Sequence, residues 1–178
     1  MHKEFFVLIF LMFPTFVAAK QLPSSCFKIT DNILFEYKCT STDVSIPEGV
    51  VKIYDGVFRN KGLTAVHIPD SVIEIGDDAF NSNELESVVI PDSVKKIGEL
   101  AFAGNQLRTL TLGHSLESIG GFAFMNNVLT EVIFPDTLIS IDTMAFLNNQ
   151  ILSVRIPKGI EYIGFMAFDD SVEVIFEN

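Results

Sequence analysis

Apolar residues recur along this chain with a period of 22 residues from Val44 to Phe168, and no insertion breaks the register. Two columns show the period most plainly, one of phenylalanine and one of isoleucine. The phenylalanine column comprises Phe58, Phe80, Phe102, Phe124, Phe146 and Phe168, and the isoleucine column comprises Ile53, Ile75, Ile97, Ile119, Ile141 and Ile163. A fixed period of about 20–29 residues is typical of a solenoid, in which each repeat forms one turn of a stack.

A proline divides each repeat into two parts. Residues 86–90 alternate polar and apolar before Pro91, which predicts a half-buried strand that ends in a turn. The spacing of Val94, Ile97 and Ala101-Phe102 favours irregular or short helical turns over a long helix. Glycine follows the isoleucine in most repeats, and we expect a positive φ there. These glycines are Gly76, Gly98, Gly120 and Gly164.

The predicted fold is therefore a repeat solenoid of stacked short parallel strands, with a convex side of irregular or short helical turns. It occupies residues 44–178 as about six 22-residue repeats, of which the last is truncated. Residues 171–176 form the final strand. That strand is two residues short of the register, because six positions separate Phe168 from Val174 whereas eight separate Phe146 from Val154.

The segment before the repeats divides into a leader and a cap. Residues 1–19 have the composition of a secretory signal peptide, with an apolar run from Phe5 to Val17 and small residues at Ala18-Ala19. The alternative is a membrane anchor, but a run of 13 residues is short of the roughly 20 that span a bilayer. We therefore expect export to the periplasm, the cell surface or the medium, with no transmembrane segment after cleavage.

Residues 20–43 are expected to form an N-terminal cap. Cys26 and Cys39 are the two cysteines of the chain, and an oxidising compartment favours a disulfide between them. Apolar residues flank a turn at Asp31-Asn32, which predicts a hairpin tied by that disulfide. The alternatives are lipidation of Cys26, for which Pro23-Ser24-Ser25 is a poor signal, and a metal site, for which the pair supplies half a ligand set.

Composition and motifs narrow the class of function. The formal net charge of −11 argues against a nucleic-acid partner. No catalytic, nucleotide-binding or metal-binding motif is present, and the histidines after the leader, His67 and His114, lie in different columns. We therefore expect a protein that is not an enzyme and that has no cofactor and no metal.

Two polar columns admit a functional and a structural interpretation. The asparagines either form a polar ladder that binds a ligand, or their amides bond to main-chain groups in the turn, which we favour. The residue after each proline is either a solvated turn former or, at Asp70 and Asp92, half of a site for a divalent cation. The two columns are Asn83, Asn105, Asn127 and Asn149, and Glu48, Asp70, Asp92, His114, Asp136 and Lys158.

The outward positions of the strands form the candidate binding face, because solenoids commonly bind through such surfaces. Alternation assigns to this face Ala65, His67, Ser87, Val89, Thr109, Thr111, Glu131, Ile133, Ser153 and Arg155. Val89 and Ile133 would add an apolar contact area beside the threonines. The alternative is an ordinary solvated sheet.

The repeat LxxVxIPxSVxxIGxxAFxxN resembles the BspA-like leucine-rich repeats over about residues 44–176. Gly113, Tyr54 and Asp142 depart from the pattern singly. The resemblance implies a secreted or surface-exposed protein that acts in adhesion or protein binding. We therefore expect a binding module that contacts a protein or a surface glycan through its sheet face. The alternative is a structural spacer of the cell envelope that associates end to end.

Overall fold

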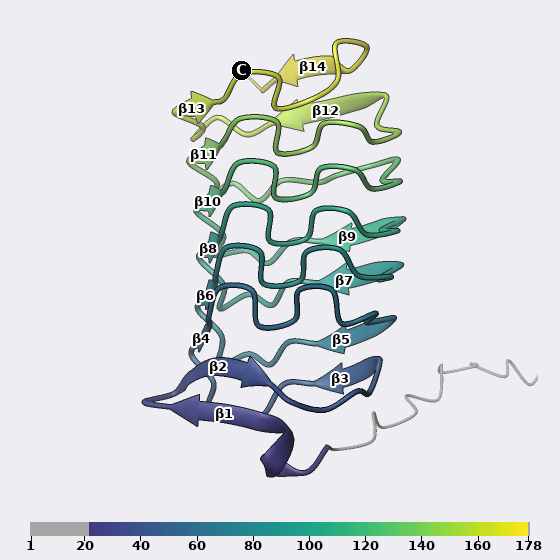
Figure 1. Cartoon of the computed structure of the whole chain (residues 1–178). Coiled ribbons are helices and arrows are strands. Elements are labelled where there is room, and N and C mark those ends of the chain that lie inside the picture. Colours follow the sequence, from purple (N-terminus) through teal and green to yellow (C-terminus); the bar gives the residue numbers. More distant parts are fainter. Residues whose placement is uncertain (1–21, 178) are drawn as a thin grey trace, which may run out of the picture.

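The computed structural model describes residues 22–177. The chain winds into a column of stacked turns that begins at an N-terminal hairpin and ends at β14 (Glu173–Phe176) (Figure 1). Each turn crosses two strand columns, which lie on opposite sides of the molecule in this view. The predicted solenoid of stacked parallel strands is confirmed.

The first strand column forms one continuous sheet. Its parallel members pair isoleucine to isoleucine 22 residues apart, as in Ile75 against Ile97. They are β4 (Lys52–Ile53), β6 (Glu74–Ile75), β8 (Lys96–Ile97), β10 (Ser118–Ile119), β11 (Ser140–Ile141) and β13 (Tyr162–Ile163). The antiparallel hairpin of β1 (Phe27–Thr30) and β2 (Ile33–Tyr37) completes this eight-stranded sheet, with β2 parallel to β4.

The second strand column forms three separate two-stranded sheets, β3–β5, β7–β9 and β12–β14. Their strands are β3 (Asp43–Ser45), β5 (Ala65–His67), β7 (Ser87–Val89), β9 (Thr109–Thr111), β12 (Ser153–Ile156) and β14. Ser87 pairs with Thr109 at the regular spacing, whereas Val154 pairs with Val174 across only 20 residues. This pairing confirms that the final strand is two residues short.

Turns, rather than helices, connect the two strand columns. Within residues 22–177 the one helix is the 3-10 turn η1 (Ser24–Cys26), which precedes the hairpin. The sequence predicted irregular or short helical turns after each proline, and the segment is irregular. It also contains a two-residue strand. That strand was not predicted, because a pair such as Lys96-Ile97 is too short to show alternation.

A stack of phenylalanine rings runs through the core. Successive rings from Phe58 to Phe168 lie 4.9–5.5 Å apart between centroids, with interplanar angles of at most 13°. Tyr37 of the hairpin extends the stack, since its ring lies 5.2 Å from that of Phe58. The repeat-to-repeat burial of these rings supplies the apolar contact that a single repeat lacks.

The asparagine column ties each turn to the preceding one. Asn105 donates through Nδ2 to the carbonyl oxygens of Phe80 and Phe102, both at 3.0 Å, and its Oδ1 accepts the N–H of Leu85 at 3.2 Å. Asn83, Asn127 and Asn149 repeat this arrangement. The amides thus satisfy buried main-chain groups, as the structural interpretation of this column predicted.

The glycine column has a different cause from the one predicted. A Cβ at Gly98 would lie 2.6 Å from the main-chain nitrogen of Asp77 in the preceding turn, so the side chain is excluded by close approach of the turns. The positive φ lies two residues later, where φ is between 51° and 66°. That column comprises Gly56, Asp78, Leu100, Phe122, Met144 and Met166. The expectation of a positive φ at Gly76, Gly98, Gly120 and Gly164 is therefore wrong.

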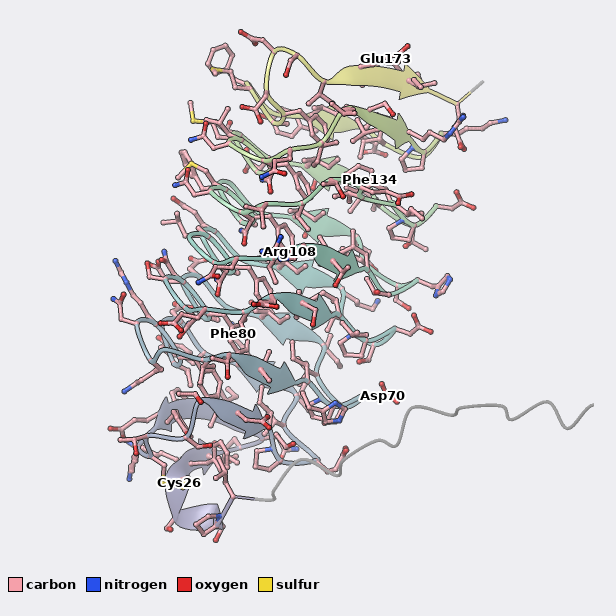
Figure 2. The ribbon with its side chains drawn as sticks, turned by 90° about the vertical axis from the view of Figure 1, so that its right-hand side faces the viewer. Cys26, Asp70, Phe80, Arg108, Phe134 and Glu173 are labelled. Atoms are coloured by element: carbon pink, nitrogen blue, oxygen red, sulfur yellow. A yellow bond between two sulfur atoms is a disulfide. The ribbon has the colours of Figure 1, made fainter. Side chains whose placement is uncertain are left out.

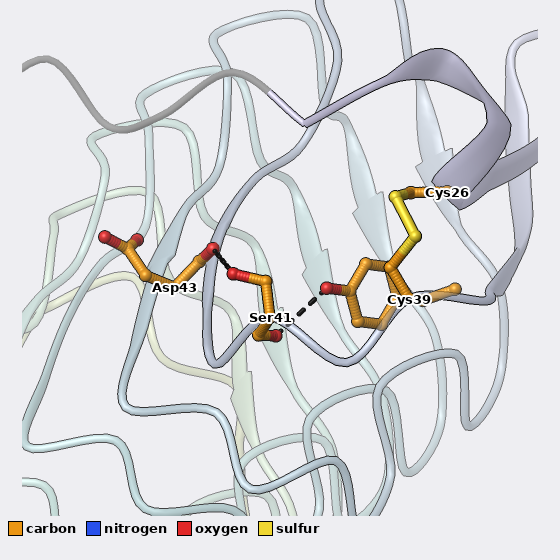
Figure 3. Close-up of a disulfide and its surroundings, with 5 residues drawn as sticks. Cys26, Cys39, Ser41 and Asp43 are labelled. Carbon is orange, nitrogen blue, oxygen red and sulfur yellow. Dashed lines mark hydrogen bonds between the residues drawn. A yellow bond between two sulfur atoms is a disulfide. The ribbon is translucent and has the colours of Figure 1, made fainter.

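The hairpin closes the first turn as expected. Cys26 and Cys39 form a disulfide, and the hydroxyl of the buried Tyr37 donates to the carbonyl oxygen of Ser41 at 3.0 Å (Figure 3). The Ser41 hydroxyl in turn donates to the carbonyl oxygen of Asp43, the first residue of β3, at 2.7 Å. Burial raises the pKa of the Tyr37 hydroxyl. The predicted disulfide-tied cap is confirmed.

Candidate functional site

All ten outward positions assigned from the sequence lie on one exposed surface, which we call the strand face. It comprises Ala65, His67, Ser87, Val89, Thr109, Thr111, Glu131, Ile133, Ser153 and Arg155, and each of these residues is exposed. Figure 2 looks onto β5, β7, β9 and β12, which carry most of this surface. Ile133 is 74% exposed and Val89 is 63% exposed, both unusual values for aliphatic side chains.

The hydrogen-bond ladder of the strand face is interrupted at residues 130–134. No hydrogen bond within residues 22–177 involves the main-chain N–H or C=O groups of these five residues. The ladder resumes on either side, where the N–H of Ile90 donates to the carbonyl of Thr111 and that of Glu177 donates to the carbonyl of Ile156. Residues 130–134 are thus held by their side chains.

A large core side chain coincides with this interruption. Phe134 lies in a column that contains isoleucine or leucine at the other positions of the regular 22-residue spacing, and its ring packs edge-on against Phe146 at 5.6 Å and Phe168 at 6.1 Å. Val132 and Phe134 are 5% and 8% exposed, so both side chains anchor the segment in the core. Ile133, between them, is exposed, and its main-chain groups have no ladder partner within residues 22–177.

Three shallow hollows follow the strand face. One of about 460 Å³ lies over Ile133 and Leu152 and has Glu131, Asp136, Arg155 and Glu177 around it. A second of about 330 Å³ separates β9 from residues 130–133. The third, of about 570 Å³, lies near His67, Val89 and His114, where β5 and β7 are unpaired. The hollows therefore accompany the gaps between the two-stranded sheets.

Within the described residues, the charged side chains around the first hollow are not engaged in ion pairs, in contrast to three pairs that join neighbouring turns elsewhere. Lys52–Glu74, Lys95–Glu117 and Arg59–Asp78 form ion pairs between neighbouring turns at 2.9–3.2 Å. Glu131, Asp136, Arg155 and Glu177 form no ion pair with any residue in the described range. These four charged side chains are exposed and free to meet a charged partner.

The column that follows the prolines contains one polar contact between turns. The main-chain N–H of His114 donates to Oδ1 of Asp92 at 2.8 Å, and the ring nitrogen Nδ1 lies 2.9 Å from the same oxygen. These two contacts lower the pKa of the Asp92 carboxyl, and the main-chain hydrogen bond contributes most. Within residues 22–177 no group of three or more His, Cys, Asp or Glu side chains is placed to hold a metal ion, so a cation at Asp70 and Asp92 gains no support.

The histidines stay apart in the fold. In the described part of the chain, the His114 ring has Asp92 as its polar partner, and the His67 ring makes no hydrogen bond. Neither imidazole is hydrogen-bonded to a hydroxyl or thiol that would serve as a nucleophile.

Among residues 22–177 no helix has the length and apolarity needed to cross a bilayer. The predicted signal peptide, residues 1–19, lies outside the described residues.

The predicted binding face omitted Leu152, Asp136 and Glu177, which also line the first hollow. Leu152 carried a signal, because its column is polar in the preceding repeats, with Glu86, Arg108 and Thr130. It is 81% exposed, the highest value among the large apolar side chains described. The interruption of the ladder had no signal apart from the unusual Phe134.

The family model described as BspA type leucine rich repeat region matches residues 27–151 in six copies. No curated protein sequence matches the chain. Among solved structures, a leucine rich cell surface protein from Faecalibacterium prausnitzii A2-165 is 25% identical, with a TM-score of 0.56 over 85% of this chain and 53% of that one. The chain thus spans about half the length of that relative.

A leucine rich repeat protein of T. pallidum has the same fold, with 24% identity and a TM-score of 0.53. The alignment covers 85% of this chain and 68% of that one. A further leucine-rich repeat protein from Eubacterium ventriosum is 20% identical with a TM-score of 0.52, and the alignment covers 74% of this chain and 32% of that protein. These two similarities establish the fold alone.

Proposed function

Because this chain belongs to the BspA type leucine rich repeat family, we propose that it is a non-enzymatic exported protein that binds a partner at a cell surface through its strand face. The observation that carries the proposal is the exposure of Val89 and Ile133 beside backbone that has no ladder partner. Exposed aliphatic side chains next to unpaired main-chain groups favour contact with another polypeptide.

A protein partner is favoured over a surface glycan. Flat sugar rings commonly pack against exposed aromatic side chains, and none of the ten strand-face residues is aromatic. The surface instead combines threonine and serine hydroxyls with two aliphatic side chains, a composition that suits a polypeptide. Adhesion is the biological role that such binding would serve.

An extracellular location is supported by two observations. The Cys26–Cys39 disulfide forms and persists in oxidising compartments. The relative from Faecalibacterium prausnitzii is described as a cell surface protein. Together with the signal peptide predicted at residues 1–19, these support export to the cell surface or medium.

The test is capture of a partner by the exported protein from the native cell surface. Replacing Thr109 and Thr111 with arginine places two bulky positive side chains at the centre of the strand face, so capture should be lost while the circular dichroism spectrum and melting temperature stay unchanged. The matched control replaces Tyr162 of the first sheet and Ile139 beside it, both exposed, with arginine and should leave capture intact. Equal capture by both variants would contradict the proposal.

End-to-end association is the second candidate, and one observation favours it. In β14, Phe176 is 61% exposed and Val174 is 37% exposed. If these side chains join two copies, Val174→Glu with Phe176→Glu converts an oligomer into a monomer in sizing experiments. A wild-type protein that is monomeric at all concentrations tested would eliminate this candidate.

A further inference from the structure

We propose that the partner docks in the hollow over Ile133 and Leu152, and that the docked segment is an extended basic peptide with an apolar anchor. We call this surface the Ile133 hollow, and it is lined by Glu131, Ile133, Asp136, Leu152, Arg155 and Glu177 among others. The inference rests on the proposed function, that the strand face binds a protein, and adds the place and the chemistry of the partner.

The Ile133 hollow has an apolar part that can receive an anchor side chain. Ile133 and Leu152 are 74% and 81% exposed and line the same hollow of about 460 Å³. Both side chains project from turns whose core residues are buried, as Val132 and Val154 are 5% and 2% exposed. An aliphatic side chain of a partner removes water from both at once, which makes this the natural position for an anchor residue.

The charged side chains around the hollow indicate that the docked peptide is positively charged. Three carboxylates, Glu131, Asp136 and Glu177, border the hollow against one guanidinium, that of Arg155. None of the four is engaged in an ion pair within the described residues, so no internal partner must be displaced. The net charge of −11 extends the same field over the whole molecule. Lysine and arginine side chains are therefore attracted, and an acidic segment is repelled.

The backbone favours an extended peptide over other basic partners. The main-chain groups of residues 130–134 have no hydrogen-bond partner within residues 22–177, and those of the exposed residues Thr130, Glu131 and Ile133 lie along the hollow. Main-chain donors and acceptors at a surface are the groups that an extended polypeptide satisfies with its own backbone. A peptide strand can thus combine main-chain hydrogen bonds, one apolar anchor and flanking basic side chains in one short segment.

The experiment measures binding of three short synthetic peptides to the purified exported protein by isothermal titration calorimetry. The first alternates lysine and valine, the second replaces each lysine with glutamate, and the third replaces each valine with serine. The first peptide should bind. The second should not bind, and the third should bind about tenfold more weakly because it lacks the apolar anchor.

Variants locate the site. Ile133→Thr and the pair Glu131→Gln with Asp136→Asn should each weaken binding of the first peptide about tenfold, and the pair should also flatten its salt dependence. The matched control is Ile73→Thr, because Ile73 is likewise an exposed isoleucine, 44% exposed, and lies outside the strand face. This control should bind with wild-type affinity.

The outcomes separate this inference from the proposed function. Equal binding of the first and second peptides, absence of binding to the first, or equal weakening by Ile73→Thr and Ile133→Thr would overturn the inference. If partner capture through Thr109 and Thr111 persists in those cases, the strand face still binds and the Ile133 hollow is wrong. The peptide comparison uses the unmodified protein, so it decides the matter even where a variant fails to fold.

Discussion

Asn105 donates through Nδ2 to the carbonyl oxygen of Phe80, 25 residues earlier in the chain, at 3.0 Å. The same amide bonds to Phe102 in its own turn, so one side chain joins two turns of the stack. Since Asn105 is 7% exposed, its removal leaves buried carbonyl oxygens without a donor.

We predict that Asn105→Ala lowers the free energy of unfolding by about 3 kcal/mol, because several buried main-chain groups lose their partners. Urea denaturation followed by circular dichroism measures the change. Gln106→Ala is the control, because Gln106 is exposed and its backbone is not in the left-handed region. If the two variants lose equal amounts of unfolding free energy, the hydrogen bonds of the asparagine column have no special role in stability.

Gly98→Ala should destabilise the fold by about 2 kcal/mol or more, because the added Cβ meets the main chain of the preceding turn at 2.6 Å. Gly121→Ala serves as the comparison, since a Cβ there meets its nearest neighbour, the carbonyl oxygen of Thr143, at 3.4 Å. Thermal unfolding of both variants gives the difference. A Gly98 variant as stable as the Gly121 variant would mean that the turns are not closely apposed.

Asp92 should titrate below the ordinary aspartate value of about 3.9. Its pKa is lowered first by the main-chain N–H of His114 and then by the His114 ring. A depressed pKa in the folded state adds stability above the unfolded pKa, and this stability is lost as the pH falls through the folded pKa. Carboxyl-carbon NMR titration of the wild type and of His114→Ala provides the measurement.

The two causes are separable in that titration. His114→Ala removes the ring but keeps the main-chain N–H, so the pKa of Asp92 should rise only part of the way to its ordinary value. Full recovery in the variant would assign the whole effect to the ring. If Asp92 of the wild type titrates at the ordinary value, its contact with His114 does not stabilise the carboxylate.

Replacing Cys26 and Cys39 with serine should cost about 3 kcal/mol, the value expected for a short closed loop. Because a solenoid is stabilised by contacts between neighbouring turns, the loss should appear first in the hairpin and β3. Hydrogen exchange should therefore accelerate in residues 27–45 more than in β11 and β13. A uniform acceleration along the whole stack would contradict this nearest-neighbour picture.

The repeat period predicted most of the fold, because columns of Phe, Ile and Asn report one buried position in every turn. The period also placed the ten strand-face residues on one side, since alternation around Val88 and Leu110 assigns their neighbours outward. The disulfide followed from two cysteines in an expected oxidising compartment. The fold and the location of the candidate surface were therefore accessible from the sequence.

Other features depended on distances between turns, which a single repeat does not encode. The glycine column reflects contact between Gly98 and the turn before it, whereas the positive φ lies at Leu100 and its equivalents, where a bulky residue gives no hint of it. The interruption of the ladder at residues 130–134 likewise coincides with the packing of Phe134 against Phe146 of its own repeat and Phe168 of the next. The hollow beside it became apparent only in three dimensions.

Site-specific photocrosslinking tests the central claim, that the strand face binds the partner, most directly. A photoreactive amino acid would be placed in turn at Ser87, Thr109 and Ser153 on the strand face and at Lys96 and Tyr162 on the first sheet, all of which are exposed. The account predicts that crosslinks to the partner form from the three strand-face positions and not from the other two. Crosslinks that form mainly from Lys96 and Tyr162 would contradict it.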